Sequence, residues 1–453
     1  MAEVKTEARD GFKSRWGFIL ACIGSAVGMG NIWRFPILVS AYGGLSFLLP
    51  YFVFVVLVGA SGVMEEFALG RAAGAGPVGA CGMCTELRYK NRKAGEAIGY
   101  IPIIGSLGLS IGYTVVFAWI CKYAVMSITG SMYAMGTDMA TIGGTFGMTA
   151  PEAYADFNIM GAATIWIVVA AIIAFIIMAA GIAGGIEKAN KVMMPVLFGL
   201  FLVLAIYIAT LPGASNGYSY ILGFNAPITG QTLIYAFGQA FFSLSVGGNG
   251  SVIYGSYLSK DESIPTSARN VALFDTIAAL LAAFVIIPAM AAAGAELSSG
   301  GPGLMFVYLV NVINGMPGGR IVGVIFFVAV LFAGLSSIIN LYEAPTALLQ
   351  EKFKLKRIPA VAIMLAIGAI VAICIQPITS PWMDVVSIYI CPLGALITAI
   401  MFFWVAGKDF AEEQVSLGSA KKIGKWFYPL GKYVFCACAL IALIAGAALG
   451  GIG

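Results

Sequence analysis

The chain has 453 residues, of which 60% are hydrophobic and 10% charged, and its mean hydropathy is +0.96. Soluble domains carry about a quarter charged residues, so this composition excludes a soluble globular protein and indicates an all-α, polytopic membrane protein. The net charge of +4 points to no particular partner, because the basic residues are spread over several loops. We expect the lipid bilayer as a partner and no nucleic acid. The absence of histidine removes the commonest proton relay and zinc ligand.

Apolar runs long enough to cross a bilayer, about 20 residues each, occur eleven times. They lie near residues 17–40, 45–69, 97–127, 161–183, 191–212, 231–257, 267–293, 319–349, 358–376, 383–406 and 429–450. Lysine and arginine concentrate before the first run and in every second loop. The positive-inside rule therefore predicts a multi-pass protein of the inner (plasma) membrane with a cytoplasmic N-terminus and an external C-terminus.

Two of these runs are interrupted by glycine. The first contains Gly24–Pro36, with three glycines within seven residues, and the sixth contains Ser243–Gly250. Each glycine is about 1 kcal/mol worse than alanine inside a helix, and freed backbone groups at membrane depth are tolerated only inside protein or beside a cavity. Paired breaks in two halves of a chain point to the binding site of a secondary transporter. Tight helix packing is the alternative for Gly24 and Gly28, but it leaves Asn31 and the second break unexplained.

The order of the spans predicts one transmembrane transporter domain over residues 1–453. Spans one to five and six to ten run in opposite orientations, as a five-plus-five inverted repeat requires, over about 9–212 and 231–406. The last span, 429–450, is then an additional helix. The segment 294–318 is too broken to span and is predicted to be an external loop with a short helix.

Polar and ionisable side chains within the spans are few, and each one is costly in lipid, so each is a functional hypothesis. They are Arg34, Glu66, Gln239, Ser243, Ser245, Asp275, Ser336, Ser337 and Asp384. The alternative for each is an internal hydrogen bond that holds helices together. With the two breaks, they favour a site for a hard cation and a zwitterion, because hydroxyls, carboxylates and freed carbonyls supply oxygen ligands. No soft or imidazole ligand set indicates a transition metal.

Six ordered motifs carry a family resemblance. They are Arg15–Leu20, Gly24–Pro36, Glu66–Arg71, Gly185–Lys188, Tyr254–Tyr257 and Ala333–Ser337. Over about residues 9–405 the chain resembles the neurotransmitter:sodium symporters, and most closely their eleven-span bacterial amino-acid members. The resemblance implies a leucine-transporter-like fold with broken helices 1 and 6. It also implies sodium-coupled symport of a neutral amino acid by alternating access, and no enzymatic activity.

The same resemblance implies two sodium sites and a substrate site. The first sodium site would use the substrate carboxylate with Ala26, Asn31, Ser243 and Asp275. The second would use Gly24, Val27, Ala333, Ser336 and Ser337. The substrate would lie among Ser25, Ala26, Gly28, Gly30, Leu109, Tyr113, Phe242, Ser243, Ser245, Gly248, Ser337 and Leu341. The outer gate would be Arg34 with Asp384, and the inner gate Arg9 with Glu351, near Tyr257.

Departures from the family pattern refine the expected substrate. Gly28 stands where monoamine-type relatives carry an aspartate, so the ligand must bring its own carboxylate, as an amino acid does. Gly248 leaves room for a large apolar or aromatic side chain. The alternative is a proton- or sodium-coupled carrier of another small solute, such as an amine, on the same fold. The sequence contains no motif that supports a channel or an intramembrane enzyme.

A final departure concerns chloride. Tyr51, Gln239 and Ser243 match three of the chloride-binding positions of chloride-dependent relatives, but the fourth falls on Ala279, which has no hydroxyl. Asp275 would place a fixed carboxylate beside the first sodium ion and supply the charge that chloride otherwise brings. We therefore expect no chloride requirement.

Overall fold

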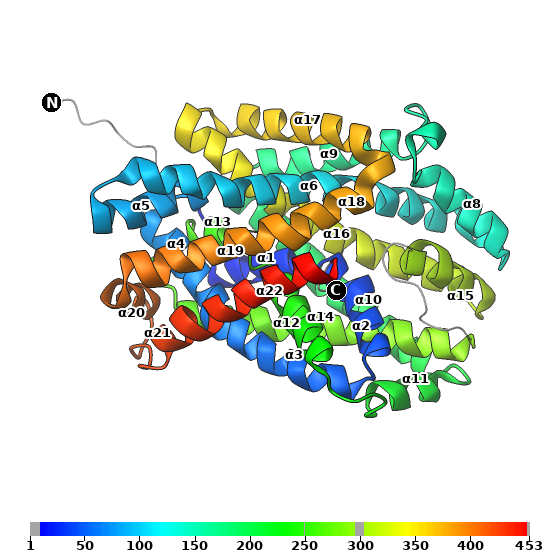
Figure 1. Cartoon of the computed structure of the whole chain (residues 1–453). Helices are drawn as coiled ribbons and strands as arrows, with labels where there is room; N and C mark the ends of the chain where they lie inside the picture. Colours follow the sequence, from blue (N-terminus) through cyan, green and yellow to red (C-terminus); the bar gives the residue numbers. More distant parts are fainter. Residues whose placement is uncertain (1–9, 249, 295–302, 451–453) are drawn as a thin grey trace.

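The structure is a computed structural model that describes residues 10–248, 250–294 and 303–450. Within these ranges all regular structure is helical, apart from one isolated bridge between Gly44 and Phe224. The helices pack side by side into one bundle, and most of the long ones run in roughly the same direction (Figure 1). The all-α membrane class expected from composition is confirmed.

The α-helices lie as follows. In chain order they are α1 (Arg15–Ala26), α2 (Phe35–Ala41), α3 (Leu45–Val58), α4 (Met64–Ala73), α5 (Pro77–Tyr89), α6 (Arg92–Thr129), α7 (Ser131–Ala134), α8 (Met139–Thr149), α9 (Thr164–Ala179), α10 (Lys188–Ala209), α11 (Ala214–Ile221), α12 (Gly230–Ser243), α13 (Gly250–Gly255), α14 (Ile264–Ala292), α15 (Leu309–Gly315), α16 (Gly319–Phe353), α17 (Arg357–Ile375), α18 (Thr379–Val385), α19 (Cys391–Ala399), α20 (Lys408–Ser416), α21 (Phe427–Pro429) and α22 (Cys436–Leu449). Short π-helical or 3₁₀ segments continue several of them: η1 (Gly30–Arg34), η2 (Gly59–Val63), η3 (Tyr154–Asp156), η4 (Ile182–Glu187), η5 (Leu304–Tyr308), η6 (Gln376–Ile378), η7 (Val386–Ile390), η8 (Ile400–Ala406) and η9 (Leu430–Phe435).

Seven continuous helical segments in the described part of the chain are long and apolar enough to cross a membrane. They are Leu45–Ala73, Arg92–Thr129, Ile182–Ala209, Ile264–Ala292, Gly319–Phe353, Arg357–Ala406 and Phe427–Leu449. An eighth is the pair Arg15–Ala26 and Gly30–Ala41, which is bent by 56° at the predicted first break. The number of eleven membrane spans stays a prediction, because three of the predicted regions do not form separate long helices. Helix α9 is short, α12 and α13 are separate helices, and α17 to η8 form one helical segment. Figure 1 shows α17 and α19 as two rods joined through α18.

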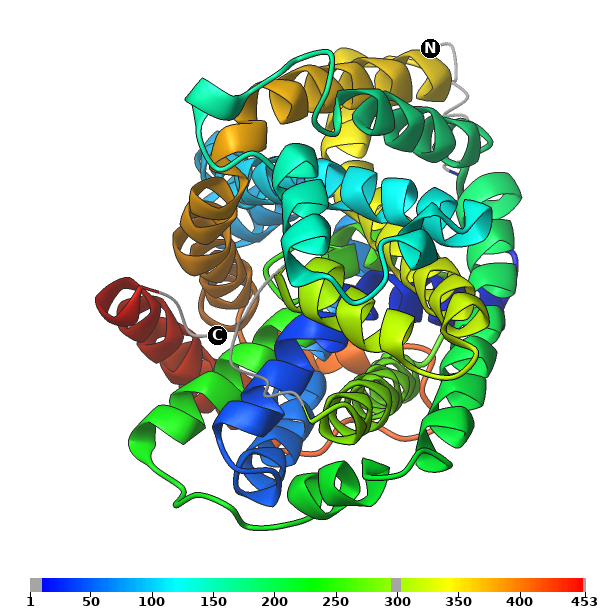
Figure 2. The same ribbon diagram turned by 90° about the vertical axis from the view of Figure 1, so that its right-hand side faces the viewer.

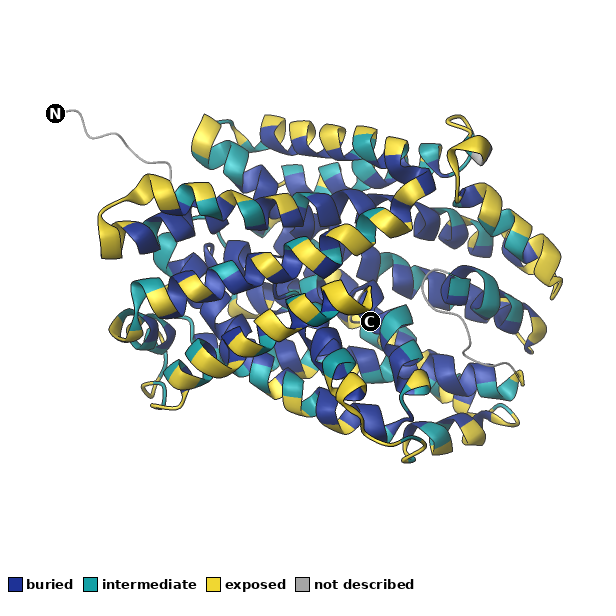
Figure 3. Cartoon of the chain, viewed as in Figure 1, coloured by how far each residue is buried: buried dark blue, intermediate teal, exposed yellow. Residues whose placement is uncertain are grey.

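The outer faces of the peripheral helices are apolar and exposed. Figure 3 shows exposed residues along the outsides of α17, α19 and α22, around a buried interior. On α17 these include Ile363, Ile367 and Ile370, and on α22 Ile441 and Ile444. Contiguous exposed apolar surface of this kind marks a membrane-facing side. After a quarter turn, α22 is seen at the rim of the bundle (Figure 2).

The loop predicted over 294–318 does contain a short helix. It is formed by η5 and α15, and residues 295–302 of this loop lie outside the described residues. The Asn314 amide of α15 donates hydrogen bonds to the carbonyls of Met132 and Gly136, at 2.9 and 2.8 Å. This loop therefore packs on α7 and on the turn that follows it.

Candidate functional site

The two broken helices enclose a cavity of about 70 Å³ near the centre of the bundle. All of the residues predicted to surround the substrate line this cavity, and Asn31 and Arg34 line it too. The cavity is also lined by residues that the sequence did not single out: Gly238, Phe241, Val246, Ser387, Ile388, Cys391 and Pro392. Most of them lie on η7 and α19, and nothing in their local sequence marks them as facing a cavity.

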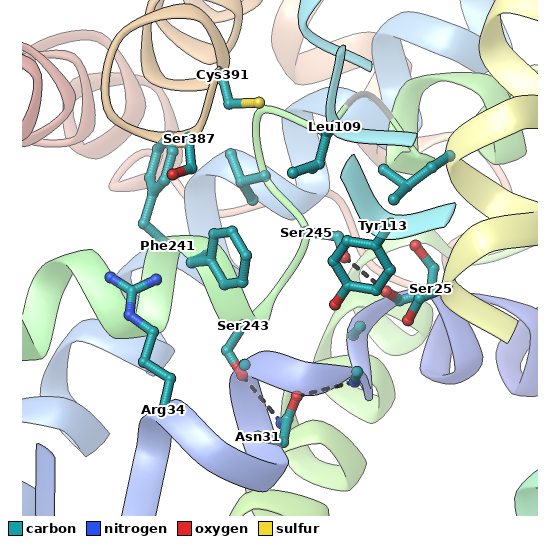
Figure 4. Close-up of a pocket in the computed structure, with 18 of the residues that line it drawn as sticks. Ser25, Asn31, Arg34, Leu109, Tyr113, Phe241, Ser243, Ser245, Ser387 and Cys391 are labelled. Atoms are coloured by element: carbon teal, nitrogen blue, oxygen red, sulfur yellow. Dashed lines mark hydrogen bonds between the residues drawn. The ribbon is translucent and has the colours of Figure 1, made fainter. Parts of the chain in front are cut away.

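The two breaks are tied directly to each other. The Ser245 hydroxyl donates to the Ser25 carbonyl at 2.8 Å, a bond that Figure 4 shows beside Tyr113. Ser245 has a φ of +55° and Gly247 one of +93°. A non-glycine residue held in this left-handed region costs about 1–3 kcal/mol and is typical of functional sites.

Side chains from other helices bond to backbone groups of both breaks. The Gln239 side-chain amide donates at 3.1 Å to the Gly30 carbonyl, which also accepts a hydrogen bond from the Phe35 amide. The Gly247 amide donates to a Glu66 carboxylate oxygen, also at 3.1 Å. Freed backbone groups inside a membrane need such partners, so the buried Glu66 and Gln239 stabilise the two breaks.

Tyr113 of α6 forms one wall of the cavity. Its hydroxyl accepts a hydrogen bond from the Met29 amide at 3.1 Å. A Cβ at Gly28 would lie 2.7 Å from the Ser337 hydroxyl and 2.9 Å from the Tyr113 hydroxyl, so a larger residue at this wall would displace one of these hydroxyls. A Cβ at Gly248 would make only ordinary contacts at 3.6 Å, and the cavity is therefore roomier there.

Region 1, which we define as Ala26, Asn31, Ser243 and Asp275, is a connected polar cluster. The Asn31 amide nitrogen donates to Asp275 Oδ1 at 2.7 Å and to the Ser243 hydroxyl at 3.1 Å. Ser243 in turn donates to Asp275 Oδ2 at 2.8 Å. Figure 4 shows Ser243 and Asn31 joined in this way below the cavity. The Asn31 amide oxygen accepts a hydrogen bond from the Gly28 amide at 3.1 Å. Asp275 and Ser243 contribute a carboxylate and a hydroxyl, which are oxygen ligands that fit a hard cation.

Region 2, defined as Gly24, Val27, Ala333, Ser336 and Ser337, lies where the end of α1 meets α16. The Ser336 hydroxyl donates to the Ala333 carbonyl at 3.0 Å. The Ser337 hydroxyl is buried and has no hydrogen-bond partner among the described residues. A buried hydroxyl without a partner is costly, and a cation with oxygen preference fits beside it.

Asn190 of α10 adjoins region 2 and was missed by the sequence analysis. A Cβ at Gly24 would lie 2.2 Å from the Asn190 amide oxygen and 2.9 Å from Ser336 Cβ. The Asn190 amide nitrogen donates to the Ile186 carbonyl at 2.9 Å, while its oxygen has no partner in the described part of the chain. Asn190 precedes the predicted span 191–212, so nothing in the sequence pointed to it, whereas in the structure it lies within α10.

The expected outer-gate residues lie as follows. The Arg34 guanidinium carbon is 4.9 Å from the centroid of the Phe242 ring, a cation–π distance. Asp384 lies on α18 with an exposed side chain. In Figure 4, Arg34 and Phe241 lie on one side of the cavity and Tyr113 and Ser25 on the other.

The expected inner gate is only partly described, because Arg9 lies outside the described residues. Glu351 accepts a hydrogen bond from the Gly76 amide at 3.0 Å. Tyr257 donates to Glu343 at 2.7 Å.

Glu343 also forms a bidentate ion pair with Arg357, at 2.7 and 2.8 Å. The Glu343 carboxylate is fully buried. Neither Glu343 nor Arg357 was among the predicted site residues, although a glutamate inside the apolar span 319–349 was a signal that could have been used. Through this pair the start of α17 is fixed to the C-terminal half of α16.

Comparison with known proteins decides the family. A sequence model described as the "Sodium:neurotransmitter symporter family" matches residues 9–138 and 145–448. The chain belongs to this family. An uncharacterized sodium-dependent transporter of Methanocaldococcus jannaschii is 32% identical over 92% of this chain and 86% of its own length. The mouse sodium- and chloride-dependent neutral and basic amino acid transporter B(0+) is 24% identical over 94% of this chain and 77% of its own length.

A solved structure has the same fold. The crystal structure of MhsT in complex with L-phenylalanine is similar with a TM-score of 0.82 and 32% identity, over 96% of this chain and 99% of that one. The family resemblance drawn from the motifs is thus confirmed. The protein is a multi-pass membrane transporter of a sodium-dependent family that includes amino-acid transporters.

Proposed function

We propose that this protein carries a neutral amino acid into the cell together with sodium, by alternating access around the central cavity. The observation that carries the proposal is the cavity between two broken helices, flanked by the oxygen-rich regions 1 and 2. If the substrate carboxylate completes the ligand shell in region 1, substrate and sodium raise each other's affinity reciprocally. Each transported sodium charge adds about 2.3 kcal/mol of driving force per 100 mV.

The proposed substrate is an amino acid with a large apolar or aromatic side chain. No charged side chain occupies position 28, so the ligand must supply the carboxylate. The open wall at Gly248 and the apolar Val246, Leu341 and Ile388 favour a bulky side chain. The relative MhsT was crystallised with L-phenylalanine, which is consistent with this choice.

The proposal includes two sodium ions and no chloride. Region 1 would hold one sodium ion and region 2 the other. Asp275 is fully buried beside Ser243, so its carboxylate would balance the charge in region 1. Ala279 is also fully buried and has no hydroxyl for an anion.

The proposed topology has eleven spans in a five-plus-five inverted repeat, in the plasma membrane. Helix α9 would be the fourth span, α12 with α13 the sixth, and α17 to η8 the ninth and tenth. The distribution of basic residues supports a cytoplasmic N-terminus and an external C-terminus.

Uptake into proteoliposomes tests the function. Labelled phenylalanine, leucine and glycine, and phenethylamine as the matching amine, are offered with an inward gradient of sodium or of choline. We expect uptake of the large amino acids only in sodium, and exchange against unlabelled substrate, as a carrier requires. Thermal shift measures binding separately, since a ligand of the folded state stabilises it by RT ln(1 + [L]/Kd). Equal uptake in choline contradicts sodium coupling, and tight binding of the amine with the amino acid inert would establish the amine carrier instead.

A further inference from the structure

A second cavity lies on the outer side of the bundle, away from the central site. Its volume is about 560 Å³, and it is a groove between the segment α3–η2–α4 and the first half of α14. The lining residues are Phe52, Val55, Val56, Gly59, Ala60, Met64, Pro265, Thr266, Arg269, Ala272, Leu273 and Thr276. Val56 and Leu273 are more than half exposed, so the groove opens on a surface that faces lipid.

The dimensions of the groove match one leaflet of a bilayer. From Pro265 to Thr276 the wall on α14 is about 16 Å long at 1.5 Å per residue, and half of a hydrocarbon core is about 15 Å. At the floor, a Cβ on Gly59 would lie 3.2 Å from Ala272 Cβ, so the two helices nearly touch there. The groove is therefore a narrow apolar slot that one acyl chain can fill.

Arg269 is the one charged side chain in the lining. It is exposed, and no other described residue bonds to it or pairs with it. The two threonines of the lining are satisfied within the protein: Thr276 donates to the Ala272 carbonyl at 2.7 Å, and Thr266 shares a hydrogen bond with Ser263 at 3.0 Å. Among the polar side chains of the lining, the one left to bind a ligand is thus a cation.

Arg269 lies close to the start of α14, at the level of the lipid headgroups. Helix α14 has 29 residues, about 43 Å, and exceeds the hydrocarbon core of about 30 Å at its ends. The sixth residue of such a helix falls near the interface, whichever side of the membrane that is. An arginine there attracts anionic lipid headgroups and binds phosphate oxygens in a bidentate manner.

We propose that this groove is a binding site for one anionic phospholipid. Its phosphate meets Arg269, and one acyl chain lies along Met64, Ala60 and Val56 towards Phe52 and Thr276. Ala272 and Thr276 flank Asp275 on α14, so an occupied groove supports the helix that carries the carboxylate of region 1. This site is separate from the central cavity and does not depend on which solute the protein carries.

Native mass spectrometry of the full chain in detergent tests the proposal. The probes are phosphatidylglycerol and phosphatidylcholine with the same 16- and 18-carbon chains, free oleate, and phosphatidylglycerol with six-carbon chains. We expect about fivefold stronger retention of long-chain phosphatidylglycerol than of phosphatidylcholine, as one favourable charge at a membrane surface gives, and weak retention of the short-chain lipid. Oleate bound as well as phosphatidylglycerol would make this a fatty-acid site and overturn the proposal.

Variants test the contribution of the lipid headgroup separately from that of the acyl chain. Arg269→Gln should abolish the preference for phosphatidylglycerol, Arg269→Lys should keep it, and the exposed Arg88→Gln on α5 should leave it unchanged. Ala60→Phe fills the groove and should weaken both lipids, whereas Ala366→Phe on the exposed face of α17 should not. A preference that survives Arg269→Gln, or binding that survives Ala60→Phe, contradicts the site.

Photolabelling of the wild-type protein tests the position of the lipid without any variant, so it is informative even if a variant fails to fold. Phosphatidylglycerol with a photoreactive group at the end of one acyl chain should label the wild-type chain within α3 or α14, which form the inner end of the groove. Labelling spread evenly over the membrane-facing helices would overturn the proposal.

Discussion

Regions 1 and 2 both include residues of the first break, yet they are built differently. In region 1 the polar side chains are already bonded to one another, and one of them is the Asp275 carboxylate. Region 2 is neutral, relies on carbonyls and two hydroxyls, and leaves the Ser337 hydroxyl without a partner in the described structure. Region 1 is therefore held together by its own hydrogen bonds, whereas region 2 leaves a buried hydroxyl available to a ligand. We infer that region 1 supplies the fixed charge and region 2 responds more to occupancy.

The largest effect should come from Asp275. Asp275→Asn removes a fixed negative charge that would lie a few ångströms from the proposed sodium ion. The attraction between the two charges is worth about 3–4 kcal/mol at an effective dielectric constant near 20. Sodium affinity should therefore fall by roughly two to three powers of ten. Asp275→Asn combined with Ala279→Ser should recover sodium binding only in chloride. Sodium titrations by thermal shift in chloride and gluconate measure both effects. A wild type that loses binding in gluconate would show that Asp275 is not the compensating charge.

Removal of a neutral oxygen ligand from region 2 should reduce sodium affinity less than Asp275→Asn does. Ser337→Ala deletes one hydroxyl, for which about 1–1.5 kcal/mol is a reasonable loss, so sodium affinity should fall about tenfold with no chloride effect. The matched control is Ser387→Ala, which changes a hydroxyl in the lining of the same cavity outside both regions. If Ser337→Ala introduces chloride dependence, the distinction between the two regions is wrong.

A smaller effect is expected at Asn190, which adjoins region 2 without belonging to it. Asn190→Leu replaces the amide oxygen by methyl groups of similar size and should weaken sodium binding several-fold, by roughly 1 kcal/mol. Asn190→Asp adds a charge at the same place and should strengthen it. The same titration checks both variants. Equal losses in both would show that Asn190 acts only in packing against Gly24.

The smallest effect on sodium affinity should follow from Gly248→Leu. Position 248 contacts neither region, and the added side chain enters the roomy wall of the cavity beside Leu341. Competition binding should show a shift from large towards small amino acids while the sodium titration in the absence of substrate stays unchanged. A changed sodium titration would mean that the cavity wall and the cation regions are not separable.

The sequence predicted the local features of this site better than it predicted the contacts between distant helices. Glycine spacing located both breaks, and the family motifs named residues that the structure gathers around one cavity. The ion pair of Glu343 with Arg357 and the contact of Asn190 with Gly24 depend on which faces of distant helices meet. In an apolar span a face towards lipid and a face towards protein have the same composition, so periodicity does not reveal these contacts. The same limit applies to Ser387 and Ile388.

The hydrogen bonds that join the breaks to distant parts of the chain imply an order for the biogenesis of the protein. The Ser25 carbonyl accepts a hydrogen bond from Ser245, which is made 220 residues later, and the Gly247 amide donates to Glu66, which is made 181 residues earlier. At about 5–20 residues per second, the first break waits roughly 10 to 40 s for its partner after it leaves the ribosome. During that interval its open backbone must stay near water or the insertion machinery, because lipid cannot satisfy it. The second break, in contrast, meets a waiting partner as soon as it is inserted.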